Sequence, residues 1–138
     1  MKSKLFVILF PCLVFIFSSC AKVADPEPVS TDNRTVFLGH WSVNESWTRF
    51  TYDVTITADP NSSDGVFIAN FANTGSTSVP AGASISGKKI ILDPNQVIGE
   101  GLTINGSGIY SASGPVINWN YTIFDGADLI TASATYTR

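Results

Sequence analysis

The feature that most constrains the fold is an alternation of apolar and polar side chains with a period of two residues. In residues 49–58, apolar side chains occupy every second position, and arginine, threonine or aspartate occupies the positions between them. Such alternation is typical of a strand with one face in a core and the other in water. Two later segments repeat it, with single faces formed by Ile117, Trp119, Tyr121 and Ile123, and by Ile130, Ala132, Ala134 and Tyr136.

Turn-forming residues divide the chain after residue 34 into short segments with no long helical periodicity. Besides residues 49–58, the predicted strands are 66–71, 81–85, 89–92, 102–105, 109–112, 116–124 and 129–138. Glycine, proline, serine, asparagine or aspartate marks turns at 59–65, 86–87, 99–101, 106–108, 113–115 and 125–126. Short strands joined by tight turns predict an all-β fold, an antiparallel up-and-down meander that closes into a barrel of about eight strands. A β-sandwich is the alternative.

The first twenty residues follow a different pattern. Lys2 and Lys4 precede an apolar run of thirteen residues, from Leu5 to Phe17. That run is short of the roughly 20 residues a membrane-spanning helix needs, so it is typical of a signal peptide. Ser18 and Ser19 then precede Cys20, which resembles the lipobox that lipoprotein signal peptidase cleaves. An ordinary secretory signal cut nearby is the alternative.

We therefore expect three parts: a signal peptide (1–19), a lipidated Cys20 that begins a flexible tether (20–33), and a β domain (34–138). Two or more acyl chains hold a protein stably on a membrane, at about 0.8 kcal/mol per buried CH₂ group. The expected location is the bacterial cell envelope, with the outer membrane favoured and its face left open. The mature chain keeps six basic residues against eleven acids, a net charge of −5, which argues against nucleic acid as a partner.

The mature chain has few of the side chains that catalysis or metal binding usually needs. His40 is the only histidine, and Cys12 leaves with the signal, so no disulfide and no Ser-His-Asp or Cys-His mechanism is expected. Residues 59–65 offer oxygen ligands, but their spacing favours a plain turn over a calcium loop. We expect no enzyme activity, no metal and no cofactor. A hydrolase that uses paired turn carboxylates is the least favoured alternative.

A tryptophan near the start of the β domain and an arginine at its end form a recognisable pair. Gly39-His40-Trp41 opens the first strand and Arg138 ends the last, which resembles the lipocalin barrel, where an arginine of the closing strand stacks on a tryptophan of the first. Residues 38–138 are also similar to small lipocalin-like (calycin-type) domains of uncharacterised Gram-negative lipoproteins. The segments that carry this similarity are 38–41, 52–56, 104–108 and 134–138. The resemblance implies a fold and a location, with no established activity.

The aromatic side chains are many for a domain of this size. They either fill the core or line an apolar pocket, and an eight-stranded barrel has room for side chains or for one small ligand. The candidates are Trp47, Tyr52, Trp119, Tyr121 and Tyr136. The expected function is non-enzymatic binding of a small apolar ligand, or of an envelope protein or glycan. The alternative is a structural or surface lipoprotein with a filled core.

Overall fold

The computed structural model describes residues 32–47, 49–99 and 101–138. The predicted signal peptide, Cys20 and most of the tether lie outside these residues. The described chain forms strands β1 (Gly39–Glu45), β2 (Thr51–Ala58), β3 (Gly65–Ala69), β4 (Ala81–Ser86), β5 (Lys89–Leu92), β6 (Gln96–Ile98), β7 (Leu102–Ser111), β8 (Val116–Phe124) and β9 (Leu129–Thr137). A short 3₁₀ helix, η1 (Phe71–Asn73), follows β3. In this part of the chain no helix is long and apolar enough to cross a membrane.

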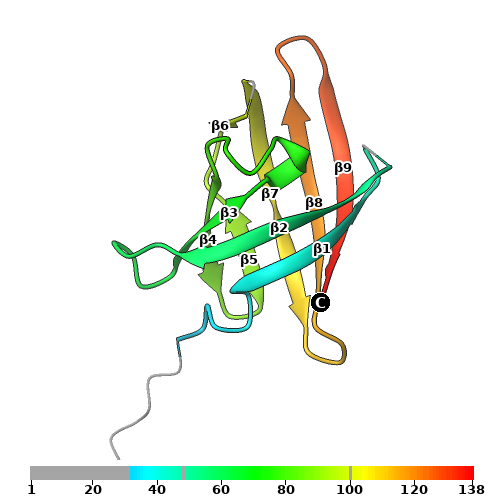
Figure 1. Cartoon of the computed structure of the whole chain (residues 1–138). Coiled ribbons are helices and arrows are strands. Elements are labelled where there is room, and N and C mark those ends of the chain that lie inside the picture. Colours follow the sequence, from blue (N-terminus) through cyan, green and yellow to red (C-terminus); the bar gives the residue numbers. More distant parts are fainter. Residues whose placement is uncertain (1–31, 48, 100) are drawn as a thin grey trace, which may run out of the picture.

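Eight of the strands close into an antiparallel barrel (Figure 1). Consecutive strands pair from β1 to β5 and from β7 to β9, and β9 pairs back onto β1. The ring is closed by β5, which pairs with β7 through Lys89–Ile109 and its neighbours, while the short β6 pairs with the start of β7. The predicted closed meander of about eight strands is confirmed. The sandwich alternative is wrong, because β1 and β5 each have a neighbour on both sides and no sheet edge separates two layers.

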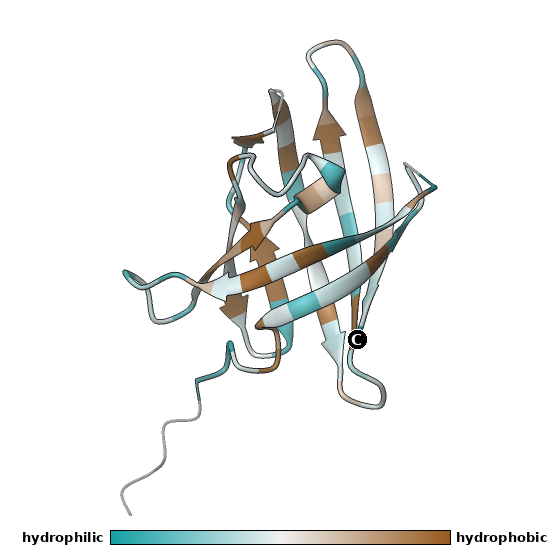
Figure 2. Ribbon diagram, viewed as in Figure 1, coloured by the Kyte–Doolittle hydropathy of each residue, from teal (hydrophilic) through white to brown (hydrophobic). Residues whose placement is uncertain are grey.

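The period-two pattern sends one set of side chains into the barrel and the other into water. Along β8 and β9 the buried positions alternate strictly with exposed or half-exposed ones, which Figure 2 shows as alternating brown and pale bands on the strands. The largest buried side chains are Phe37, Trp41, Phe71, Trp119 and Tyr136, with isoleucines contributed by most strands. Since each strand buries one face, the barrel interior is the single core of the described domain.

The turn predicted at residues 106–108 is wrong, because β7 runs through it as one strand of ten residues. Gly106 pairs with Tyr121 and Gly108 with Trp119 on β8. A Cβ added to Gly108 would lie 2.8 Å from the Trp119 ring. Gly108 therefore provides space for the Trp119 ring, Gly106 allows the close approach of β8, and neither glycine breaks the strand. The predicted strand 66–71 is shorter than expected, because the chain leaves the sheet after Ala69 and enters η1.

Candidate ligand site in the barrel interior

One end of the barrel is closed by the pair that the lipocalin resemblance implies. The Cζ atom of Arg138 lies 4.4 Å from the centroid of the Trp41 ring. The guanidinium also donates hydrogen bonds to the carbonyl oxygens of Leu38 (2.8 Å) and Val36 (3.0 Å). The Trp41 indole is 1% exposed, and its Nε1 donates to the Phe37 carbonyl at 2.7 Å. The structure thus brings together Trp41 and Arg138, which are far apart in the sequence. Together with the buried Phe37, they close this end of the barrel.

The segment around η1 covers the opposite end, away from the C-terminus (Figure 1). Phe71 is buried and contacts the rings of Trp119 and Tyr121, with centroid distances of 5.4 and 4.9 Å. Asn70 ties the segment to the barrel, because its Nδ2 donates to the Asp53 carbonyl on β2 at 2.8 Å. Phe71 therefore acts as a plug that enters the barrel from a loop.

The backbone of this plug adopts an uncommon conformation. Asn70, Ala72 and Asn73 have φ angles of 62°, 53° and 57°, in the left-handed region that residues other than glycine seldom occupy. Such positions cost free energy and persist only where the surrounding contacts hold them, and they gather at ligand clamps and switch segments. Ala72 is itself buried, so the strained backbone of η1 is held by the packing of this end of the barrel.

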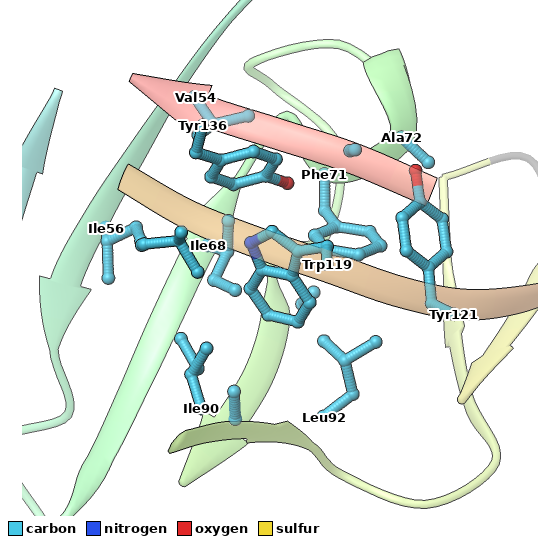
Figure 3. Close-up of a cluster of buried hydrophobic side chains, with 14 of the residues drawn as sticks. Val54, Ile56, Ile68, Phe71, Ala72, Ile90, Leu92, Trp119, Tyr121 and Tyr136 are labelled. Atoms are coloured by element: carbon cyan, nitrogen blue, oxygen red, sulfur yellow. The ribbon is translucent and has the colours of Figure 1, made fainter. Parts of the chain in front are cut away.

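Between the two ends lies a cluster of aromatic rings (Figure 3), which we call the interior cluster: Phe71, Trp119, Tyr121 and Tyr136. The centroids of the Trp119 and Tyr136 rings are 5.5 Å apart, and each member of the cluster is at most 2% exposed. Cross-strand partners explain how the rings fit. Tyr121 pairs with Ala132 and Trp119 with Ala134 on β9, so small side chains flank the large ones on one side and the β7 glycines flank them on the other.

Three polar atoms of the interior cluster are buried without a hydrogen-bond partner among the described residues: Trp119 Nε1 and the hydroxyls of Tyr121 and Tyr136. A buried polar group left without a partner costs about 1–3 kcal/mol. Folded proteins satisfy nearly all such groups with protein, ordered water or ligand. Three of them in one aromatic cluster are consistent with an interior that accepts hydrogen-bonding groups from a small guest molecule.

Glu45 and Tyr52 add a charged feature beside the interior cluster. Glu45 is 1% exposed and is the buried charged side chain among the described residues. Burial, then the negative charge of Glu45 and a hydrogen bond with it, raise the pKa of Tyr52 above its usual value. Burial, followed by the charges of Tyr52 and Glu45, also raises the pKa of Tyr136. Both tyrosines therefore stay neutral at pH 7.

The register explains why Glu45 lies beside the cluster. Glu45 ends β1 on the same face as Trp41 and Val43, and it pairs with Ala134, which in turn pairs with Trp119. Neighbouring strands are about 4.8 Å apart, so the backbones of Glu45 and Trp119 are about 10 Å apart across β9. Ala134, which lies between them in the sheet, is a small buried side chain.

Trp47 lies at the surface, not in the core or pocket where it is predicted. Of the five aromatics expected in the core or a pocket, Tyr52, Trp119, Tyr121 and Tyr136 face the interior. Trp47 lies in the turn after β1 and is 36% exposed. The alternation that directs Trp41 and Val43 inward ends with the strand at Glu45, so the parity of Trp47 no longer decides its orientation.

The other candidate groups fall at the surface. His40 is exposed on β1, where its Nδ1 lies 3.0 Å from the Thr55 hydroxyl. Asp59 organises the turn after β2, since its side chain accepts a hydrogen bond from the Asn61 amide. Among the described residues, no group of three or more histidine, cysteine or acidic side chains is placed to hold a metal ion.

Sequence reasoning missed Glu45 and Phe71 as members of the interior. The signal for Glu45 was present, because it continues the parity of Trp41 and Val43 in the first strand. A charged residue at an inward position normally indicates that a strand has ended, so the sequence pattern did not place Glu45 in the interior. Phe71 was assigned to a strand, and only the turn into η1 places its ring inside the barrel.

A scan against protein-family models and searches of curated proteins and of solved structures find no match to this chain.

Proposed function

We propose that this protein is a lipid-anchored lipoprotein of the bacterial cell envelope whose lipocalin-like barrel binds one small ligand and has no enzymatic activity. The observation that carries the binding proposal is the set of buried polar atoms of Trp119, Tyr121 and Tyr136 that lack protein partners. The lipocalin likeness is supported by the stacking of Arg138 on Trp41, which leaves the η1 end as the side from which a ligand enters. The signal sequence and Cys20 support the anchor.

An eight-stranded barrel holds either its own side chains or one small ligand, so the proposed ligand is a small molecule and not a long lipid. The ligand would displace Phe71, which enters the barrel from the strained η1 segment, and would then contact Trp119 and Tyr136. An apolar body with one hydrogen-bonding group fits this lining, since rings and aliphatic side chains surround the few polar atoms.

A structural role is the second candidate, favoured by an outward-facing row at one rim. Val97, Phe124 and Leu129 are exposed by 58%, 41% and 70%. They share a row through Thr103, which pairs with both Val97 and Phe124, while Phe124 pairs with Leu129. In this alternative the interior is filled by its own side chains and the rim makes the contacts.

Tryptophan fluorescence of the full chain, titrated with small alcohols, amines, esters and aromatic compounds, separates the two candidates. Binding is expected to quench or shift the emission by at least a tenth, because Trp119 lines the site. Trp119→Phe is expected to remove most of the response, and Trp47→Phe is the matched control that retains it. A flat titration across the whole set would retire the binding proposal and favour the structural role.

The anchor is tested by metabolic labelling with palmitate. The wild-type chain is expected to incorporate the label, and Cys20→Ala is expected to lose all of it, since the thiol is the acylation site. Ser19→Ala is the matched control, because alanine is also a small residue before the cysteine. Equal labelling of wild type and Cys20→Ala would overturn the lipoprotein assignment.

A further inference from the structure

Phe71 differs from the other rings of the interior cluster in the element that carries it. Trp119 and Tyr121 lie on β8 and Tyr136 lies on β9, so none of these three can leave the interior without breaking strand pairs. Phe71 enters from η1, which lies outside the sheet. The described interior is filled with side chains, so a guest can enter only in place of one of them. Phe71 is the ring of the cluster that a guest can replace while the strands stay paired.

The segment that carries Phe71 makes several of its hydrogen bonds within itself. The Asn73 amide donates to the Asn70 carbonyl at 3.1 Å, and the Gly75 amide donates to the Asn70 side chain at 2.7 Å. The Asn70 side-chain amide reaches across to the Asp53 carbonyl on β2, at an exposed position. Moving the segment outward therefore breaks the bond to Asp53 and the packing of Phe71, and it frees the left-handed backbone of η1 to relax.

The side chains around Phe71 form a site for an aromatic ring. The Phe71 ring meets the Trp119 ring at 73° and the Tyr121 ring at 60°, with centroid distances of 5.4 and 4.9 Å. Such tilted and edge-to-face arrangements bring the positive edge of one ring to the negative face of another, which a saturated ring cannot do. An aromatic ring that takes the place of Phe71 keeps both contacts.

The cluster also holds polar atoms with which Phe71 cannot pair. The hydroxyls of Tyr121 and Tyr136 are buried without a hydrogen-bond partner in the described part of the chain, and both side chains are at most 2% exposed. Figure 3 shows the Tyr136 hydroxyl directed toward Phe71 and the Tyr121 hydroxyl directed toward Ala72. A phenyl ring has no donor and no acceptor of its own. A ring in the same place with one hydroxyl group could pair with either tyrosine.

We propose that the barrel binds small phenols, each a single aromatic ring with a hydroxyl group, and that the Phe71 side chain occupies their site until the ligand displaces it. The ligand ring takes over the contacts of Phe71 with Trp119 and Tyr121, and the ligand hydroxyl pairs with Tyr121 or Tyr136. Phe71 thus competes with the ligand, so the wild-type chain binds more weakly than a barrel without that ring. This inference rests on the proposed function, since it names the ligand class of the same site.

Isothermal titration calorimetry of the full chain compares phenol with cyclohexanol, which lacks the aromatic ring, and with toluene, which lacks the hydroxyl. Phenol is expected to bind at least five-fold more tightly than cyclohexanol. Tyr121→Phe combined with Tyr136→Phe is expected to weaken phenol binding at least five-fold and to leave toluene binding within two-fold. Tyr110→Phe is the matched control, because Tyr110 packs on Phe37 at the closed end, and it is expected to keep the wild-type affinity for phenol.

The displacement of Phe71 is measured separately. Phe71→Ala removes the competing ring and is expected to bind phenol at least ten-fold more tightly than the wild-type chain. In the wild-type chain, saturating phenol is expected to speed amide hydrogen exchange in residues 73–75 at least three-fold, since their turn leaves the barrel. Residues 35–38 are the internal control, because their amides also make local hydrogen bonds but lie at the closed end, and their exchange is expected not to increase.

The outcomes separate this inference from the proposed function. Cyclohexanol binding as tight as phenol binding would overturn the selectivity for an aromatic ring while leaving a ligand-binding barrel. Phenol binding with unchanged exchange in residues 73–75 would overturn the displacement of Phe71. A wild-type chain that binds no phenol would refute the inference, and the tryptophan titration with alcohols, amines and esters then decides whether the proposed function fails as well. The wild-type measurements decide both points even where Phe71→Ala does not fold.

Discussion

Replacing Trp41 with alanine is expected to lower the free energy of unfolding by about 3–5 kcal/mol, the range for removing a large buried aromatic side chain. The ring is 1% exposed, and its loss also removes the hydrogen bond to Phe37 and the surface on which Arg138 stacks. Small domains have total stabilities of about 5–15 kcal/mol. Urea unfolding followed by far-ultraviolet circular dichroism measures the change without relying on tryptophan emission.

Trp47→Ala is the matched control for this substitution, because it removes the same side chain from an exposed turn. Its expected effect is below about 1 kcal/mol, since exposed positions contribute little. If Trp41→Ala destabilises the domain no more than Trp47→Ala does, the closed end of the barrel is not held by Trp41.

Gly106→Ala is expected to destabilise the domain by about 2–5 kcal/mol, the sum of overpacking and backbone strain. Gly106 has a φ of 154°, and an added Cβ would lie 2.5 Å from the Asn120 carbonyl oxygen and would overlap Tyr121. Neither neighbour can move freely, because the Asn120 carbonyl oxygen and the Tyr121 Cα and Cβ atoms are fixed by the backbone of β8. Thermal unfolding would show the loss as a lower Tm.

The matched control is Gly114→Ala in the turn between β7 and β8. An added Cβ there meets no atom within 4 Å, so its expected effect is within about 0.5 kcal/mol. Similar Tm values for the two variants would contradict the close approach of β7 to β8 at Gly106.

The strands were predictable where alternation was strict and turns were dense. Residues 116–124 and 129–137 form β8 and β9 nearly as expected, because nine-residue alternation leaves one way to bury an apolar face. Residues 106–108 misled the prediction, since two glycines near a serine have the composition of a turn. Pairing with Tyr121 and Trp119 on β8 keeps both glycines in a strand, and the local sequence of β7 does not contain that partner strand.

The residues of the candidate site also divide into those that local sequence predicts and those that it does not. Tyr52, Trp119, Tyr121 and Tyr136 were identified from parity and residue type, and all four face the interior. Glu45 and Phe71 were not, because a carboxylate at an inward position and a ring on a loop both run against local expectation. Each is placed inside by contacts with distant segments: Glu45 by pairing with β9, and Phe71 by packing on Trp119.

By itself the sequence determined an all-β chain, the face of most strands that is buried and the aromatic residues available for the core. These follow from interactions within a strand or across one turn, where neighbours in space are also neighbours in sequence. Only the tertiary structure decided that β5 pairs with β7 to close the barrel, that Phe71 covers one end, and that a carboxylate lies beside the aromatic cluster. Those features depend on contacts between segments far apart in the chain, whose register no local pattern encodes.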